Sequence, residues 1–439
     1  MATEQLTYKD VNRDILGILG KPSPGYLALL GFTIALVGLG AFAWGTQINQ
    51  GMGVAGINHP IFWGVYITNF VFWVGIAHSG TLISAILFLF RARWRTAIFR
   101  TAEAMTVIAV MTAGLYPLIH LGRAWRFYWL FPYPNERELW VNFRSPLIWD
   151  VLAVMTYFIV SSMFLYVGML PDISAAGDAS SGWKRSIYKF LSLGWRGTVR
   201  QWKHFNAAYL FLAALATPLV VSVHSIVSWD FAMSIVPGWH STIFAPYFVA
   251  GAIHSGLAMV IMLLIPFRKI YRLERYITID HFENLAKLIV LTGFIMGYAY
   301  ATEFLVAWYS ANVFEQSIFF YRALGDYATA FWIMIVFNSL LPLTFLIRAV
   351  RTNVATLLVV SVLINVGMWF ERFVIIVGSL SHEFLPYDWG LYRWTWVEIS
   401  ISVGSLAWFF MWLLLFFKCF PAVAIAEVKE ALPRHVQES

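Results

Sequence analysis

The sequence predicts an all-α polytopic membrane protein with ten transmembrane helices. Of its 439 residues, 60% are hydrophobic and 12% are charged, whereas soluble domains are nearer half apolar and a quarter charged. Long apolar runs follow one another from Tyr26 to Phe417, each about as long as a helix that crosses a bilayer. Aromatic residues make up 18% of the chain, which suits interfacial belts around many spans.

Runs of about 20 apolar residues place the ten helices along the chain. We expect them roughly at 26–46, 61–90, 97–121, 147–170, 207–228, 243–267, 285–311, 327–349, 354–380 and 397–419. Their ends carry polar residues: the second and sixth stop at Arg91 and Arg268, the third at His120, the eighth at Arg348 and the tenth at Cys419. The first 25 residues are rich in charge and lack the apolar core of a cleaved signal peptide.

Lysine and arginine are distributed unequally between alternate loops. The N-terminus, the C-terminus, loops 91–96, 171–206, 268–284 and 348–353 and the adjoining helix ends hold 23 of the 30. The other loops hold Arg123, Arg126, Arg137, Arg144, Arg322 and Arg393, and Arg372 lies inside a helix. By the positive-inside rule we expect a multi-pass protein of the bacterial inner (cytoplasmic) membrane with both termini in the cytoplasm.

A His-Ser-Gly motif occurs twice, in "IAHSGTLISAILFLFR" (76–91) and "AIHSGLAMVIMLLIPFR" (252–268). This repeat predicts two parallel four-helix bundles plus two peripheral helices. The expected division is a cytoplasmic segment 1–25, helix 1 and an outer loop 26–60, a first bundle 61–228, a second bundle 229–380, and helix 10 with a cytoplasmic C-terminus 381–439. Parallel copies argue against the inverted repeats of many transporters.

Three successive predicted helices, 97–121, 147–170 and 207–228, bring His120, Asp150 and Asp230 to one level near the outer face. Oxidation of a quinol releases two electrons and two protons, and a histidine and a carboxylate partly removed from water are suitable proton acceptors. The aromatic segment "WRFYWLFP" (125–132) would enclose the ring and tail. The spacing is equally consistent with interfacial ion pairs between the two aspartates and the outer arginines, which are also candidates for docking a partner.

Other ionisable residues lie within the predicted spans, where such residues are functional candidates. They form a candidate discontinuous proton route from the cytoplasm: His78, Glu103, His254, Glu303 and Glu371. Alternatively they are structural, since a buried Arg372 needs a counter-charge such as a glutamate. His78 and His254 are also candidate ligands of a haem b, although their Ser-Gly context, where helices approach closely, favours packing.

The cysteine count restricts the metal chemistry. Cys419 is the only cysteine, and one thiol cannot hold an iron–sulfur cluster or a structural zinc. A metal redox centre that works with this chain is therefore a haem or belongs to a partner. The net charge of +7 is explained by the cytoplasmic loops and requires no nucleic acid.

Three features carry a resemblance to a known family: the two four-helix bundles and the segments "AHSGTLISAILFLFR" and "NVGMWFERF". In these the chain resembles the NrfD/polysulfide-reductase membrane-subunit family, over nearly its whole length. Its ten-span form is most like ActC, the quinol-site subunit of alternative complex III. The resemblance implies that the chain binds no haem or metal and carries a quinone site on its outer side. The implied quinol ligands are His120, Asp150 and Asp230, and Arg123 follows His120 on the same helical side.

The resemblance also implies partners. A docked iron–sulfur subunit would take the electrons of menaquinol or another quinol through a [3Fe-4S] or [4Fe-4S] cluster, and c-type cytochrome subunits would carry them onward in the respiratory chain. A paralogous ten-helix subunit would share the lipid membrane. Proton translocation is proposed for the family.

Several alternatives stay open at this stage. Within the family, the chain could be a membrane subunit of a molybdopterin oxidoreductase or quinone reductase, or the paralogous subunit of alternative complex III that binds no quinol. The alternatives from other classes of protein are a haem b cytochrome, a transporter and a purely structural membrane anchor.

Overall fold

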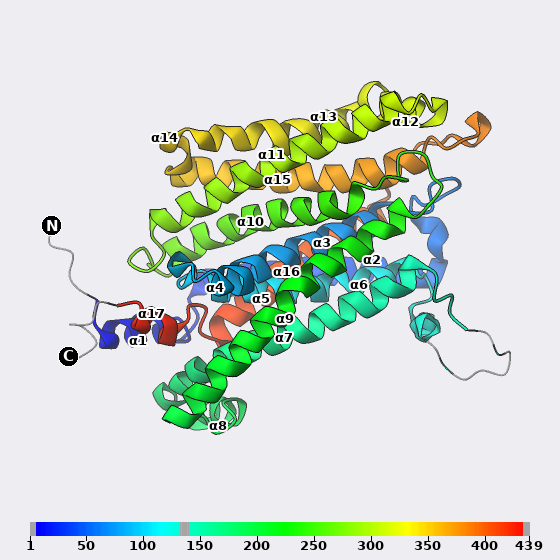
Figure 1. Ribbon diagram of the computed structural model, residues 1–439. Coiled ribbons are helices and arrows are strands. Elements are labelled where there is room, and N and C mark those ends of the chain that lie inside the picture. Colours follow the sequence, from blue (N-terminus) through cyan, green and yellow to red (C-terminus); the bar gives the residue numbers. More distant parts are fainter. Residues whose placement is uncertain (1–5, 132, 134–137, 139, 433–439) are drawn as a thin grey trace.

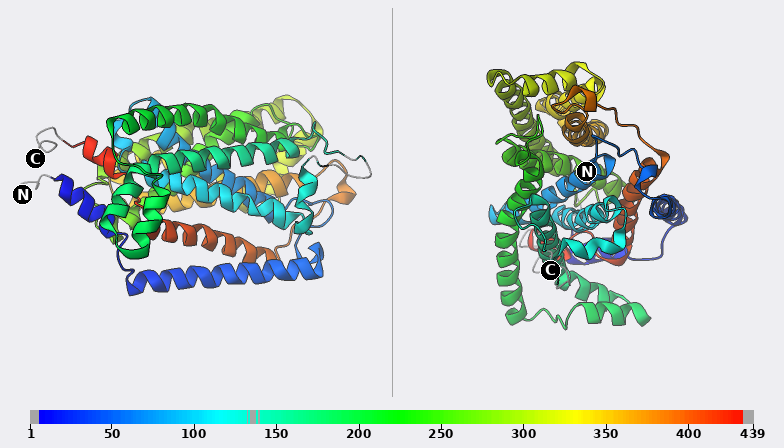
Figure 2. Two further views of the ribbon diagram at one scale, coloured as in Figure 1. Left: turned by 90° about the horizontal axis from the view of Figure 1, so that it is seen from below. Right: turned by 90° about the vertical axis from the view of Figure 1, so that its right-hand side faces the viewer.

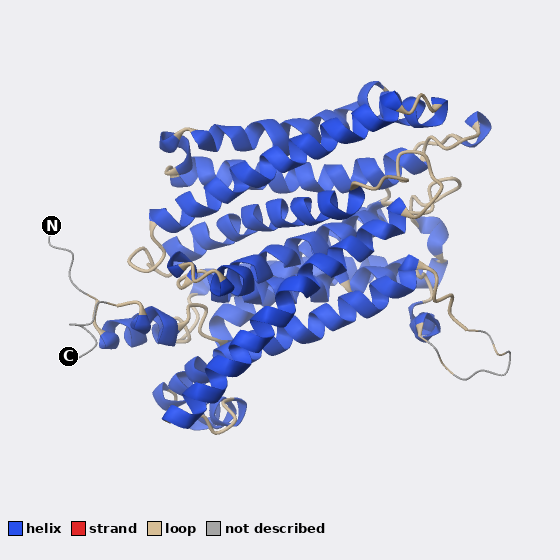
Figure 3. Cartoon of the chain, in the orientation of Figure 1, coloured by secondary structure: helices blue, strands red, loops and turns tan. Residues whose placement is uncertain are grey.

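The computed structural model describes residues 6–131, 133, 138 and 140–432, and the regular elements of that part are all helical (Figures 1 and 3). Ten helical segments among these residues are long and apolar enough to cross a membrane. They run side by side, with the loops gathered at the two ends of the bundle (Figure 3). The predicted all-α class and the ten spans are therefore confirmed.

The spans follow the predicted order, and some are divided by a short turn of a different helical type. Their bounds are α2 (Pro24–Gln50); α3 (Val65–Thr81), η2 (Leu82–Ile86) and α4 (Leu87–Leu89); α5 (Phe99–Ala113) and α6 (Leu115–His120); α7 (Pro146–Ala179); α9 (Val199–Ala232); α10 (Phe244–Ile270); α11 (Ile279–Tyr309); α13 (Ala328–Ile335), η5 (Val336–Leu340) and η6 (Leu341–Leu346); α15 (Val354–Phe373) and η7 (Val374–Gly378); and α16 (Trp396–Cys419).

Shorter helices lie at the ends of the spans. They are α1 (Tyr8–Gly17), η1 (Met52–Val54), η3 (Arg93–Arg95), η4 (Ala124–Leu130), α8 (Gly182–Leu191), α12 (Val313–Leu324), α14 (Arg348–Arg351), η8 (Pro386–Asp388) and α17 (Ile425–Glu430). α1 and α17 pack on each other at one end of the bundle (Figure 1). We call this the inner end and the opposite end the outer end.

From the sequence we expect the loop 171–206 to start flexible and to become a basic amphipathic stretch. In the structure residues 171–179 instead continue α7, and α8 follows after a two-residue break. Two hydrogen bonds hold this hairpin together: the Tyr166 hydroxyl donates to the Leu191 carbonyl (2.7 Å), and the Ser174 hydroxyl donates to the Trp195 carbonyl (3.1 Å). These contacts join residues about 20 positions apart, so local sequence patterns did not indicate them.

The packing of the spans centres on α3 and α10, which contact each other and are the two most buried of the ten. α3, α5, α7 and α9 pack around one another, as do α10, α11, α13 and α15, while α2 and α16 pair at one edge (Figure 2). The division of the spans into two parallel four-helix bundles and the proposed domain boundaries stay predictions.

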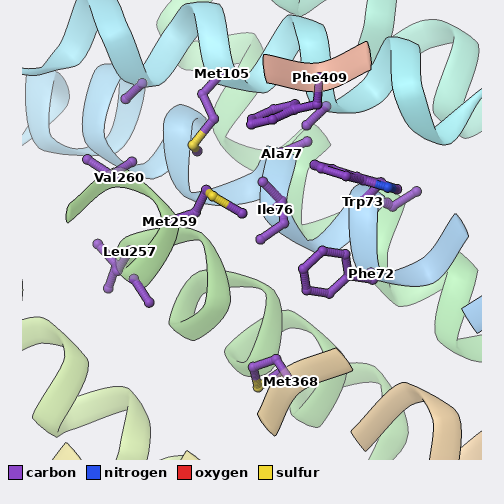
Figure 4. Packing of buried hydrophobic residues seen from close by; sticks show 14 of the residues in the cluster. Phe72, Trp73, Ile76, Ala77, Met105, Leu257, Met259, Val260, Met368 and Phe409 are labelled. Atoms are coloured by element: carbon purple, nitrogen blue, oxygen red, sulfur yellow. The ribbon is translucent and has the colours of Figure 1, made fainter. Parts of the chain in front are cut away.

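The contact between α3 and its neighbours is built from aromatic, aliphatic and methionine side chains (Figure 4). Trp73 of α3 packs against Phe409 of α16, with ring centroids 4.7 Å apart. Met105 of α5 and Met259 of α10 point into the same region (Figure 4). In a bilayer, where lipid tails are as apolar as these side chains, such close packing is a main source of helix association.

The α2–α16 pair depends on two facing glycines. A Cβ atom on Gly40 would lie 2.9 Å from the Cα atom of Gly404, whereas one on Gly38 would meet nothing within 4 Å. We therefore expect Gly40→Val to lower the free energy of unfolding by about 1–3 kcal/mol, because neither backbone can yield. The measurement is the midpoint of thermal unfolding in detergent, with Gly38→Val as the matched control. Equal midpoints in the two variants would contradict the predicted contact.

Candidate functional site

A cavity of about 380 Å³ opens at the outer ends of α3, α6, α7 and α9. Its wall is mostly apolar, and among its described lining residues three are ionisable: His120, Asp150 and Asp230. The structure thus brings the three predicted site residues into one cavity. Its aromatic and aliphatic lining includes Trp63, Phe70, Phe127, Leu130, Phe131, Leu147, Val154 and Met155. A volume of this size and a lining with few polar groups are typical of small-molecule sites.

His120 is placed by the way its helix ends. It is the last residue of α6, and Gly122 follows with a φ of 68°, in the left-handed region that favours glycine. The carbonyl group of Ile119 accepts a hydrogen bond from the Gln47 side chain (2.8 Å), and Tyr66 donates in turn to Gln47. The last turn of α6 is therefore tied to α2 and α3, which holds the imidazole at the cavity wall.

The two aspartates come from the ends of neighbouring helices. Asp150 lies close to the start of α7, which begins with Pro146, and Asp230 lies in the last turn of α9. Beside them Trp149 and Trp229 pack edge to face, with centroids 6.0 Å apart. Both carboxyl groups line the cavity. Two carboxyl groups that share a hydrogen bond need a proton on one of them.

Each of the three residues keeps a polar atom free for a ligand. Nδ1 of His120, Oδ1 of Asp150 and Oδ1 of Asp230 are buried and have no hydrogen-bond partner in the described part of the chain. Buried polar atoms without a partner are unusual in native proteins and often mark a functional site. The cavity therefore offers hydrogen-bonding positions to a bound molecule with hydroxyl or carbonyl groups.

The outer arginines have other environments. Arg123 is exposed and does not line the cavity, and the Arg126 guanidinium lies over Trp129, 4.6 Å from the ring centroid. Arg137 falls outside the described residues. Within those residues no ion pair joins Asp150 or Asp230 to an arginine. The geometry therefore favours a ligand site over an interfacial salt-bridge network, and it places Arg123 on the surface.

Comparison with known proteins identifies the family of the chain. The profile of the family "Polysulphide reductase, NrfD" matches residues 53–382, a stretch that contains the spans from α3 to α15. The chain belongs to the NrfD family. The matched stretch leaves out α2 and α16, the pair at the edge of the bundle.

Three relatives of this NrfD chain have names that describe a role. A Halobacterium salinarum protein, provisionally named as a membrane subunit of dimethyl sulfoxide reductase, is 28% identical over 93% of this chain and 92% of its own. The Hdr-like menaquinol oxidoreductase integral membrane subunit of Archaeoglobus fulgidus is 22% identical over 82% of each. A selenate reductase subunit of Mesobacillus selenatarsenatis is 22% identical over 70% of this chain and 71% of its own.

The outer end of the second predicted bundle of the NrfD chain, 229–380, holds different ionisable residues. α12, a helix that the sequence analysis did not predict, carries Arg322 into the protein, where its guanidinium donates to the Gly238 carbonyl (3.1 Å) and to the Ser379 hydroxyl. Burial lowers the pKa of Arg322, and the nearby carboxyl of Glu303 acts in the opposite direction. Glu303 lines a separate cavity of about 220 Å³ beside α12.

Glu103 lies in a buried charge cluster near the inner end. Tyr209 donates to one of its carboxyl oxygens (2.9 Å), and Arg100 lies 3.4 Å from the other. Arg100 also pairs with Asp172 (3.1 Å) and donates to the Gly168 carbonyl (2.7 Å). The sequence analysis assigned no role to Arg100 or Asp172, although a charged residue next to the end of an apolar run was a signal for both.

His78 lies against His224, with ring centroids 4.5 Å apart and both side chains buried. Nδ1 of His78 contacts the Val74 carbonyl (2.6 Å), while Nε2 of His78 and both ring nitrogens of His224 have no partner among the described residues. The sequence analysis left His224, on the fifth span, out of the candidate route. His254, by contrast, contacts the Thr292 hydroxyl (2.8 Å).

Glu371 pairs with its neighbour Arg372 at 3.0 Å, and both are buried. Tyr300 also donates to Glu371, and Asn338 donates to it at 3.3 Å. The Arg372 guanidinium lies over Phe248, 4.2 Å from the ring centroid.

The structure thus distributes the residues of the candidate proton route among separate local clusters. In the described part of the chain no group of three His, Cys, Asp or Glu side chains is arranged to hold a metal ion.

Proposed function

We propose that this NrfD chain is the quinol-binding membrane subunit of an oxidoreductase complex. The observation that carries the proposal is the outer cavity, in which His120, Asp150 and Asp230 each present a buried polar atom without a partner among the described residues. An apolar wall surrounds these atoms, as a quinol ring and its isoprenoid tail require.

The three residues suit the two proton transfers of quinol oxidation. A quinol becomes a quinone by losing two electrons and two protons. We assign the proton of one hydroxyl to the imidazole of His120, which is a suitable acceptor near neutral pH. The proton of the other hydroxyl passes to the Asp150–Asp230 pair, which accepts one more proton when it holds a single shared one. The electrons leave to an acceptor outside this chain.

That acceptor is best supplied by an iron–sulfur subunit docked at the outer end. Trp125 and Trp129, beside the cavity, are 57% and 49% exposed, and Arg123 lies on the same surface. Aromatic and arginine side chains are enriched in protein interfaces. In an alternative complex III, c-type cytochromes and a paralogous ten-helix subunit would complete the assembly. The inner end, with α1 and α17, would then face the bacterial cytoplasm.

The names of the relatives favour a second assembly with the same quinol chemistry. Two of them are called subunits of a dimethyl sulfoxide reductase and a selenate reductase, and one is called a subunit of a menaquinol oxidoreductase. A molybdopterin-type reductase complex would take the electrons from the same cavity. The quinol site is common to both assemblies, so its test does not depend on the choice.

We further propose that the buried acids and histidines conduct protons between the two ends of the bundle. The residues are His78, Glu103, His254, Glu303 and Glu371. Ionisable side chains inside a membrane are rarely retained without a role. Because they lie in separate clusters, water molecules would have to connect them.

The proposed site is tested by fluorescence-quench titration of a quinol-analogue inhibitor. We expect saturable binding to the wild-type chain and at least a roughly tenfold weaker affinity for Asp150→Asn and for Asp230→Asn, because each loses an acceptor for an inhibitor hydroxyl. Asp326→Asn, far along the chain on an exposed turn, is the control. Equal affinities in all four proteins would show that the inhibitor binds elsewhere.

A further inference from the structure

The inner end of the bundle carries an amphipathic helix that the proposed reaction does not use. α8 connects α7 to α9 and runs across the direction of the spanning helices (Figure 2). Trp183, Ile187 and Phe190 follow one another at helical spacing, so they share one face. Their side chains are 71%, 46% and 79% exposed, and no other described residue covers this apolar stripe.

Two hydrogen bonds define the depth of α8 in the membrane. The Tyr188 hydroxyl donates to the carbonyl of Cys419, the last residue of α16 (2.8 Å), and the Tyr166 hydroxyl of α7 donates to the Leu191 carbonyl (2.7 Å). About 20 residues of a helix cross the hydrocarbon layer. Since α7 begins at Pro146, Tyr166 lies near the inner boundary of that layer. α8 therefore lies where acyl chains meet headgroups.

The same contact fixes how α8 is rotated. Tyr188 is buried against the bundle, and successive residues of a helix are separated by about 100°. The stripe therefore points away from α16 and toward the surroundings of the protein. On α9, Leu210 and Phe211 are likewise exposed, at 51% and 67%.

Basic residues flank the stripe. Lys184, Arg185 and Lys189 lie on α8 and are exposed, and Arg196, Arg200 and Lys203 follow in the next segment, where they are exposed as well. Beside α8 a cavity of about 240 Å³ has polar lining from Ser180, Ser181 and Lys184, which are donors suited to a phosphate oxygen. An apolar stripe bordered by cations is the pattern of helices that lie in a membrane surface rich in anionic lipid.

We infer that α8 is a membrane-surface helix that binds anionic phospholipids. The stripe of Trp183, Ile187 and Phe190 inserts among the acyl chains, and the flanking lysines and arginines bind the phosphate headgroups of the inner leaflet. A partner subunit or a second copy of the chain would have to cover a face that lies at the depth of the lipid itself. The inference is independent of the quinol site.

The position of the stripe is tested by site-directed spin labelling of the full chain in lipid vesicles. In a Cys419→Ser background, which removes the only cysteine, Phe190→Cys and Arg185→Cys each carry one nitroxide. We expect the label at 190 to collide mainly with oxygen, and the label at 185 mainly with a water-soluble nickel chelate. Collision of the label at 190 mainly with the nickel chelate would overturn the inference. Shielding of this label from both reagents would also overturn it, since a protein partner would then cover the stripe.

The lipid preference is tested by copurification from vesicles of phosphatidylcholine with phosphatidylglycerol. We expect the variant Lys184→Gln/Arg185→Gln/Lys189→Gln to retain at most about one fifth of the phosphatidylglycerol that the wild type retains. The reason is that each basic residue near an anionic membrane surface adds to the attraction between protein and lipid. The variant Arg123→Gln/Arg126→Gln/Arg144→Gln removes the same charge at the outer end and should retain the wild-type amount. An equal loss in both variants, or no loss in either, would overturn the inference.

Discussion

Replacing His120 by alanine is expected to slow quinol oxidation by the assembled complex by about a hundredfold or more, because a positioned proton acceptor contributes about 10²–10⁴-fold to the rate. His120 lines the cavity, and its Nδ1 atom has no other partner among the described residues. The measurement is the rate of quinol-dependent reduction of the partner's redox centre. We expect kcat to fall with kcat/KM, as for a group that acts in the transition state.

His240→Ala is the matched control for this experiment. His240 also lies near the outer end, but it is exposed, and its Nδ1 contacts the Ser234 carbonyl at 3.1 Å. Its removal should leave the rate within about twofold of the wild type, since exposed polar positions rarely matter for catalysis or stability. An unchanged rate in His120→Ala would support the interpretation of the chain as a structural anchor and would contradict the proposed proton acceptor.

Arg372→Met is expected to lower the free energy of unfolding by about 3–5 kcal/mol, because breaking a buried ion pair leaves an uncompensated charge. Arg372 and Glu371 are 2% and 0% exposed, and their charged groups lie 3.0 Å apart. Tyr300 and Asn338 add hydrogen bonds to the carboxylate but no positive charge. Thermal or denaturant unfolding in detergent measures the loss.

The double variant Glu371→Gln/Arg372→Met should recover much of this loss, since it removes both charges and keeps the volume of the side chains. Arg393→Met, at an exposed outer-end arginine, controls for the loss of a positive charge and should change stability little. A double variant as unstable as Arg372→Met would show that the cost comes from lost packing on Phe248 rather than from the unpaired carboxylate.

Much of the candidate site was predictable from the sequence. Membrane helices have nearly fixed lengths and alternate in direction, so the level of a residue follows from its position in an apolar run. That reasoning placed His120, Asp150 and Asp230 at one level, and the structure gathers them in one cavity. The same reasoning predicted the ten spans, whereas the central contact of α3 with α10 is a finding of the structure.

The partners of the other charged residues were decided only by the tertiary structure. A span that is apolar on every side carries no signal for its rotation about its own axis. The sequence did not indicate that Arg123, beyond the end of α6 at His120, is exposed rather than on the helical side of His120. Nor did it indicate that Glu103 meets Arg100, that His78 meets His224, or that α12 brings Arg322 inward. The sequence by itself determined the depth of each group in the membrane, because helix length and the bilayer fix it; the neighbour of each group depends on helix rotation and packing, which only the folded chain decides.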